Sequence, residues 1–101
     1  MLYEMRTYHA IPGRLPDLNR RFADITMGYF KQYGIQVVGF WTNELGGSSD
    51  QLIYILAYDS LADREKKWNA FVSDKERLAK FAETEKNGPL VARLTAQMLR
   101  P

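Results

Sequence analysis

The chain has no cysteine and only one histidine among its 101 residues. Without cysteine there can be no disulfide framework, thiolate nucleophile, zinc ribbon or iron–sulfur cluster. A metal site would have to rest on carboxylates and that one histidine, so we expect neither a metal nor a cofactor. No apolar run approaches the roughly 18 residues of a membrane-spanning helix, and the first residues carry charge where a signal peptide has an apolar stretch. We therefore expect a cytoplasmic protein without a membrane partner.

A strong charge of either sign is also missing. Fourteen basic and 12 acidic residues leave a formal net charge of +2 at pH 7, which is too small to indicate a nucleic-acid partner. The length fits one domain covering residues 1–101. What the chain does contain is two Trp, six Tyr and five Phe, many rings for so short a sequence, and their placement needs an explanation.

The hydrophobic periodicity changes several times along the chain. Alternating, β-branched and aromatic residues predict strands over Leu2–Tyr8, Gln36–Glu44, Gln51–Tyr58 and Leu90–Leu99. Apolar residues at helical spacing predict a helix over 14–33, and Gly34 fits the position just past its end, where a positive φ is needed. Ser60 is expected to cap a second helix, and Asp74 a further helical stretch that stops at Gly88.

The resulting order, β-α-β-β-α-β, is that of a ferredoxin-like α+β fold with a four-stranded antiparallel sheet and both helices on one face. The alternation divides the sheet residues into two sets. We assign the mostly apolar set to the helix side: Tyr3, Met5, Val38, Phe40, Ile53, Ile55, Ala57, Ala92 and Leu94. The other set is expected on the helix-free face: Glu4, Arg6, Tyr8, Trp41, Asn43, Tyr54, Leu56, Tyr58, Arg93, Thr95 and Gln97.

Four aromatic residues of this second set predict an interface. Tyr8, Trp41, Tyr54 and Tyr58 would together expose on the order of 600–1,000 Å², whereas the largest apolar patch of a typical monomer is about 300–600 Å². A standard interface buries about 800 Å² per partner. We therefore expect two copies of the chain to pair sheet to sheet as a dimeric α/β barrel.

Four ordered motifs cover nearly the whole chain. They are Tyr3-Glu4-Met5-Arg6-Thr7-Tyr8 before Pro12-Gly13, Val38-Gly39-Phe40-Trp41-Thr42 before Gly46, Gln51–Tyr58 before Ser60-Leu61-x-x-Arg64, and Leu99-Arg100-Pro101. Together they resemble the NIPSNAP family. The resemblance implies a ferredoxin-like domain that forms a dimeric α/β barrel, and it brings no settled biochemical activity. The mitochondrial and vesicle roles of eukaryotic members are not expected to transfer, because the chain begins without their extension and targeting segment.

Three polar residues of the first strand are the candidates for catalysis. Glu4 and Arg6 lie two residues apart and therefore share a sheet face; Arg6 could hold a carboxylate or enolate while Glu4 tunes it or acts as a base. A structural ion pair is the competing interpretation. His9 could serve as a general base at the barrel mouth. A solvent-exposed loop histidine is the simpler interpretation, because nothing in the sequence supplies a partner to orient the ring.

The aromatic residues are the candidates for ligand binding. Tyr8, Trp41, Tyr54 and Tyr58 could line a pocket for a small apolar or aromatic molecule, oriented by their phenol and indole groups. Plain interface packing is the alternative. No phosphate-binding loop, dinucleotide fingerprint or nucleophile elbow is present.

The sequence therefore predicts a homodimer, or a higher even-numbered oligomer, that binds a small apolar or aromatic molecule in the barrel. The alternatives are a non-catalytic adaptor dimer and a cofactor-free monooxygenase or cyclase of the dimeric-barrel type, the latter resting on analogy of fold. An RNA-binding sheet has the same element order, but the third strand lacks the expected basic-Gly-aromatic start, and Glu4 would repel phosphates.

Overall fold

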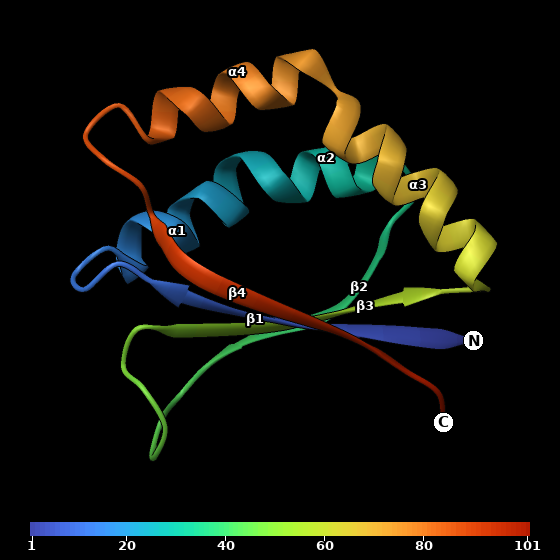
Figure 1. Ribbon diagram of the computed structural model, residues 1–101, viewed down its shortest axis with the longest axis horizontal. Helices are drawn as coiled ribbons and strands as arrows, with labels where there is room; N and C mark the ends of the chain where they lie inside the picture. The colour runs from blue at the N-terminus through green and yellow to red at the C-terminus, as the bar shows by residue number, and fades with distance from the viewer.

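The computed structural model describes residues 1–101 and confirms the ferredoxin-like α+β fold. Its elements are β1 (Leu2–Ala10), α1 (Leu15–Arg21), η1 (Phe22–Thr26), α2 (Met27–Gln32), β2 (Gln36–Thr42), β3 (Gln51–Tyr58), α3 (Leu61–Ser73), α4 (Lys75–Thr84) and β4 (Val91–Leu99). The strands form one antiparallel sheet in the order β2-β3-β1-β4. All helices lie on one side of this sheet (Figure 1). None of them is long and apolar enough to cross a membrane.

Local signals in the sequence explain where the helices begin. Ser60 Oγ accepts a hydrogen bond from the Asp63 backbone N–H at 3.1 Å, and Asp74 Oδ1 accepts one from Arg77 N–H at 2.8 Å. Both side chains satisfy an N–H group that has no partner within its helix, as predicted. Asp74 also accepts from the Tyr33 hydroxyl, and this bond links the end of the first helical segment to α4.

The first helix is continuous from α1 to α2 but contains the wide turn η1. The N–H of Met27, the residue directly after η1, donates to the carbonyl of Phe22, five residues back. This π-helical turn adds one residue to the local repeat, so the simple spacing expected over 14–33 is interrupted. Leu18, Phe22, Tyr29 and Phe30 are nevertheless buried against the sheet.

Gly34 ends this segment with φ +69°. Its N–H donates to the carbonyl of Lys31, and the next N–H, on Ile35, donates to that of Phe30. This is the Schellman arrangement, in which a glycine adopts the left-handed conformation.

We expect Gly34→Ala to lower the free energy of unfolding by about 1 kcal/mol, because a side chain is strained at this φ. Gly28→Ala in α2 is the matched control: a Cβ there meets no atom within 4 Å, and alanine should stabilise the helix interior by about 0.5–1 kcal/mol. Urea denaturation measures both. An equal response of the two variants would contradict the assignment of Gly34 as a conformational requirement.

The faces of β1 and β3 are the reverse of those predicted. Cross-strand pairing aligns Arg6 with Tyr54 on one side and with Ala96 on the other, and Tyr54 packs against Phe22 and Phe30 of the first helix. The helix side therefore holds Glu4, Arg6, Tyr8, Tyr54, Leu56 and Tyr58, whereas Tyr3, Met5, Ile53 and Ile55 face the helix-free side. The predictions for Phe40, Trp41 and Leu94 agree with the register.

The error has a physical cause. The prediction puts the more apolar set under the helices, on the premise that charged residues avoid the core. In the structure Glu4 and Arg6 of β1 are buried as an ion pair, and Arg64 of α3 also donates to the Glu4 carboxylate. A bulge near Val38 also shifts the phase of β2 relative to β3, so one alternation does not run through the whole sheet.

Candidate functional site

Glu4 is the centre of a polar cluster between the sheet and the helices. Its side chain is 1% exposed, and its Oε2 accepts from Arg6 Nη1 at 2.8 Å. Arg64 of α3 donates from Nε to Oε1 at 3.0 Å and from Nη2 to Oε2 at 3.1 Å. Burial by itself would raise the pKa of Glu4, but the hydrogen bonds from Arg64 and Arg6 outweigh it and the pKa lies below its usual value. Glu4 is therefore a carboxylate whose two oxygens are both occupied.

Arg6 connects this carboxylate to two tyrosines. Its Nε donates to the Tyr54 hydroxyl at 2.8 Å and its Nη2 to the Tyr8 hydroxyl at 3.2 Å, and these two hydroxyls lie 3.0 Å apart. The guanidinium also stacks over Trp68 of α3, 4.4 Å from the ring centroid. Although burial opposes its charge, Tyr54, Tyr8 and Glu4 raise the pKa of Arg6. The residue is thus held in one place from four sides.

Two phenols of the cluster, those of Tyr54 and Tyr58, remain protonated at neutral pH. Burial raises the pKa of Tyr54, and the neighbouring Tyr8 raises it further. Burial also raises the pKa of Tyr58, with a smaller contribution from Glu4. The Tyr58 hydroxyl is buried and has no hydrogen-bond partner.

Two members of this cluster, Arg64 and Trp68, were not among the predicted site residues. They lie four residues apart on α3 and so project from the same helix face. Arg64 closes the third motif of the family resemblance, which was the one signal that pointed to it. The contact of Trp68 with Arg6 depends on how α3 crosses the sheet, and no local pattern reveals that.

The structure does not bring His9 or Trp41 to this cluster. His9 is paired with Gln51 and Arg93, and the alternation of β1 places it on the helix-free side, opposite to Arg6. Trp41 is 48% exposed and also lies on the helix-free side. Its ring covers Gly39, where an added Cβ would come within 2.9 Å of it. Of the three predicted catalytic residues, Glu4 and Arg6 therefore belong to the cluster and His9 does not. Of the four predicted aromatic residues, the three tyrosines belong to it and Trp41 does not.

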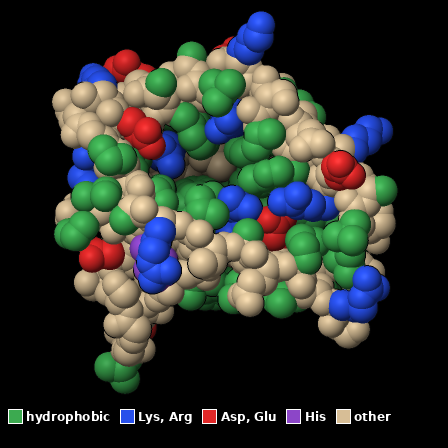
Figure 2. Space-filling model, viewed as in Figure 1, with side chains coloured by type: hydrophobic (Ala, Val, Ile, Leu, Met, Phe, Trp, Pro, Cys, Tyr) green, Lys and Arg blue, Asp and Glu red, His purple; other side chains and the backbone are tan.

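The cluster borders a hollow beside β4. No helix covers the helix side of this strand, where Leu94 and Met98 are 45% and 38% exposed and Ala96 lies opposite Arg6. Figure 2 shows the surface hollowed between β4 and the helices α3 and α4, with basic and acidic atoms side by side at its foot. We refer to this space, with Arg6 and Tyr8 in its floor, as the β4 hollow.

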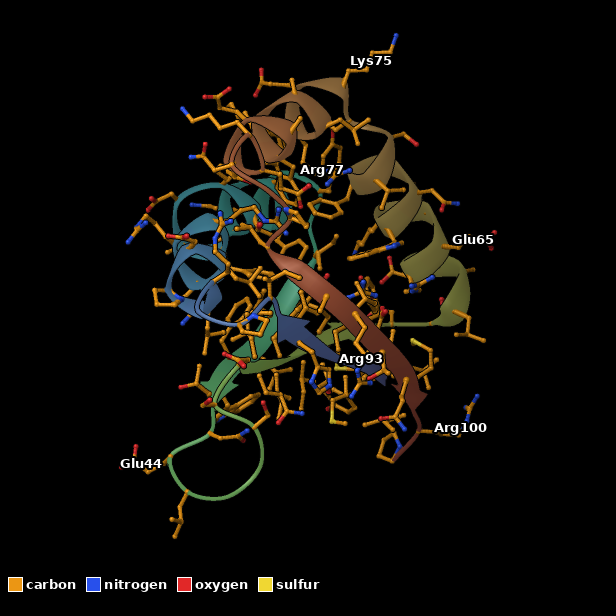
Figure 3. The ribbon with its side chains drawn as sticks, turned by 60° about the vertical axis from the view of Figure 1, so that its left-hand side comes forward. Glu44, Glu65, Lys75, Arg77, Arg93 and Arg100 are labelled. Atoms are coloured by element: carbon orange, nitrogen blue, oxygen red, sulfur yellow. The ribbon has the colours of Figure 1, made fainter.

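Arg77 lies at the corner between α3 and α4, on its inner side (Figure 3). Its guanidinium stacks on Phe71 and Phe81, with centroid distances of 4.8 and 4.6 Å. Nε donates to the Phe71 carbonyl and Nη2 to the Val72 carbonyl, at 2.9 and 3.1 Å. Arg77 therefore completes the end of α3, where carbonyl groups lack helical partners, and burial lowers its pKa.

A separate apolar pocket of about 350 Å³ opens at the other edge of the sheet. It lies between the first helical segment and the strands β2 and β3. Its lining residues are Asn19, Phe22, Ala23, Met27, Phe40, Trp41, Thr42 and Leu52. None of them is ionisable, so this pocket offers shape but little chemistry. No three His, Cys, Asp or Glu side chains of the protein lie together as a metal site would need.

A family model, curated proteins and solved structures resemble this chain. The NIPSNAP family model matches residues 3–101. NipSnap homolog 3B of Mus musculus is 29% identical over 79 residues, which are 78% of this chain and 31% of that protein. The chain thus spans about a third of the length of the curated relatives it matches.

Two solved structures resemble the whole chain. An uncharacterized NIPSNAP domain protein from Burkholderia xenovorans is 26% identical with a TM-score of 0.86, and the match covers 100% of this chain and 94% of that one. Protein Atu4242 from Agrobacterium tumefaciens is 25% identical with a TM-score of 0.86, and the match covers 100% and 93% of the two chains.

Proposed function

Since the chain belongs to the NIPSNAP family, as its match over residues 3–101 shows, we propose that it acts as a homodimer that binds a small apolar or aromatic molecule in the β4 hollow of each subunit. The observation that carries the proposal is the buried Glu4–Arg6–Tyr8 cluster at the edge of a hollow walled by exposed apolar residues. Ligand sites combine an apolar wall with a few placed polar groups that fix orientation.

The helix-free face supports the homodimer. The register places an apolar and aromatic set on this side of the sheet: Tyr3, Met5, Trp41, Ile53, Ile55 and Leu99. The polar residues His9, Arg93 and Gln97 lie on the same side, in β1 and β4. A sheet covered by helices on one side gains by burying such a face against a second sheet. The three tyrosines from which the sequence predicts a dimer, Tyr8, Tyr54 and Tyr58, lie on the helix side of the sheet. The residues that support the homodimer are therefore different from the predicted ones.

The state of the polar groups favours binding over catalysis. Glu4 is ionised, both of its oxygens accept hydrogen bonds from arginines, and its pKa is lowered. It is therefore a poor general base near neutral pH. His9, the other candidate base, lies on the opposite face of the sheet. We propose on these grounds that the cluster positions a molecule, and we do not extend the proposal to a monooxygenase or cyclase reaction.

The location of the bound molecule is tested by placing a large side chain either in the β4 hollow or in the apolar pocket. The neutral fluorescent probe N-phenyl-1-naphthylamine is titrated into the protein, into Ala96→Trp and into Ala23→Trp. Both alanines are exposed; Ala96 lies in the β4 hollow, and Ala23 lines the apolar pocket. We expect Ala96→Trp to weaken binding at least about tenfold, since a buried aromatic contact contributes about 1.5–3 kcal/mol, and Ala23→Trp to leave it unchanged.

The reverse pattern would place the molecule in the apolar pocket and contradict the proposed site. Circular dichroism spectra of the two variants serve as the folding control. Because both substitutions add the same side chain at an exposed position, a difference between them reports on location and not on the added tryptophan.

A further inference from the structure

We infer that the molecule held in the β4 hollow is an organic carboxylic acid, whose carboxylate accepts hydrogen bonds from Tyr8 and Arg6. The inference rests on the proposed function, because it assumes that the hollow is the binding site. The chemical class of the ligand follows from the charges and hydrogen bonds that the protein itself leaves unbalanced.

The charges of the cluster do not cancel. Arg6 and Arg64 both donate to Glu4, and no other acidic side chain bonds to either of them. Two guanidinium groups therefore share one carboxylate, which leaves one positive charge in excess. Arg6 is almost wholly removed from solvent, whereas the Arg64 side chain is 28% exposed. Buried charges are normally compensated, because an isolated one is costly in a medium of low polarity. A ligand with a single negative charge would supply the compensation.

The cluster also has more hydrogen-bond donors than acceptors. Arg6 uses three of its five N–H groups, on Glu4, Tyr54 and Tyr8. The contact between the Tyr8 and Tyr54 hydroxyls consumes one phenolic proton, so the other proton of this pair has no acceptor. The Tyr58 hydroxyl, deeper in the cluster, has no partner either. The cluster thus holds spare donors, while its one carboxylate is already saturated.

The position of Tyr8 makes its hydroxyl the contact point. Tyr8 is 9% exposed and is paired with Leu94, whose side chain is open to the hollow. Its oxygen receives a hydrogen bond from the guanidinium of Arg6, which polarises the O–H bond and strengthens it as a donor. A carboxylate above Tyr8 would accept this proton and face the free N–H groups of Arg6, a charge-assisted pairing.

The surroundings favour a carboxylate with an apolar body over an inorganic anion. Leu94 and Met98 form the β4 wall, and Trp68 lies over Arg6 on the α3 side. These groups offer no hydrogen bonds to the further oxygens of a phosphate, whereas they suit an aliphatic chain or an aromatic ring. The one uncompensated charge also matches a carboxylate better than a dianion.

Competition against N-phenyl-1-naphthylamine tests the inference. The competitors are 2-naphthoate, its neutral isostere 2-naphthamide, and inorganic phosphate. We expect naphthoate to displace the probe at a concentration at least about tenfold lower than naphthamide, since a hydrogen bond to a charged group contributes about 1.5–3 kcal/mol, and phosphate to be ineffective. Tyr8→Phe removes one hydroxyl and should bring the naphthoate-to-naphthamide ratio to within about threefold. Tyr3→Phe removes a hydroxyl from the other face of β1 and should leave the ratio unchanged.

The outcomes separate the two proposals. If naphthamide competes as well as naphthoate, while Ala96→Trp still abolishes probe binding, the ligand is neutral and only the present inference fails. Phosphate as effective as naphthoate would likewise overturn it, because the site would then be a simple anion site. If the probe does not bind or is insensitive to Ala96→Trp, and naphthoate binding is also absent by calorimetry, both proposals are wrong. Tyr8→Phe is preferred to an Arg6 variant, because loss of Arg6 would leave Glu4 without one of its two partners.

Discussion

Glutamine in place of Glu4 is expected to lower the free energy of unfolding by about 3–5 kcal/mol, the usual result of removing one partner from a buried ion pair. The substitution keeps the shape of the side chain but removes the negative charge that two arginines share. Arg6 would then remain buried with no carboxylate. For a domain of this size such a loss is a large part of the total stability. Urea denaturation followed by tryptophan fluorescence measures it.

Glu83→Gln provides the matched control. Glu83 also forms an ion pair, with Lys86 at 3.1 Å, but its side chain is 72% exposed. Exposed pairs contribute at most about 1 kcal/mol, so this variant should remain close to the wild type. Similar losses for the two variants would mean that the Glu4 cluster contributes no more than a surface pair.

The dependence of stability on pH gives a second measurement of what the Glu4 charge contributes to the fold. The pKa of Glu4 in the folded protein lies below the 4.5 of an unperturbed glutamate. Its charge therefore stabilises the fold above that value, and this contribution is lost as the pH falls through the lower, folded-state pKa. We expect the gap in stability between wild type and Glu4→Gln to be widest near pH 7 and to narrow at the acidic end. A gap that widens on acidification would show that the pKa is raised.

Ile55→Asp is expected to convert the proposed dimer into a monomer of 11.7 kDa. Ile55 lies in β3 opposite Met5 and Gly39, near the centre of the helix-free face. In a sheet-to-sheet dimer an aspartate there would be buried without a partner, at a cost of several kcal/mol. In the monomer the same side chain reaches water. Light scattering after gel filtration should therefore give a mass of twice 11.7 kDa for the wild type and of 11.7 kDa for Ile55→Asp.

Leu78→Asp is the control for this change. Leu78 is 49% exposed on α4, on the far side of the molecule from the helix-free face, so the same new charge should leave the dimer intact. A wild-type mass of 11.7 kDa would refute the homodimer outright. Dissociation of both variants would show that added negative charge, and not the position of Ile55, separates the subunits.

The order of the elements could be predicted because its signals are local. Ser60, Asp74 and Gly34 each act on backbone groups within a few residues of themselves, so their positions along the chain are sufficient. The π-helical turn η1 left no comparable signal, and Gly39 is the one residue of β2 that indicates the bulge beside Val38. Each of the two irregularities inserts one residue into a regular repeat.

The choice of the buried face could not be predicted in the same way. Alternation shows which residues of a strand share a face, and it correctly grouped Glu4, Arg6 and Tyr8. Which face the helices cover depends on Arg64, 60 residues further along the chain, because this residue makes burial of Glu4 tolerable. The candidate site was therefore recognised as a set of residues and placed on the wrong side of the sheet.

The sheet order has a consequence for how the protein is made. β1 lies in the middle of the sheet, and its outer neighbour is the last strand, so that Tyr3 is paired with Leu99. During synthesis the first strand leaves the ribosome long before this partner exists. Pairing of such distant segments closes a large loop and slows folding. The sheet can therefore be completed only after β4 has left the ribosome, and until then the edge of β1 that pairs with β4 remains open.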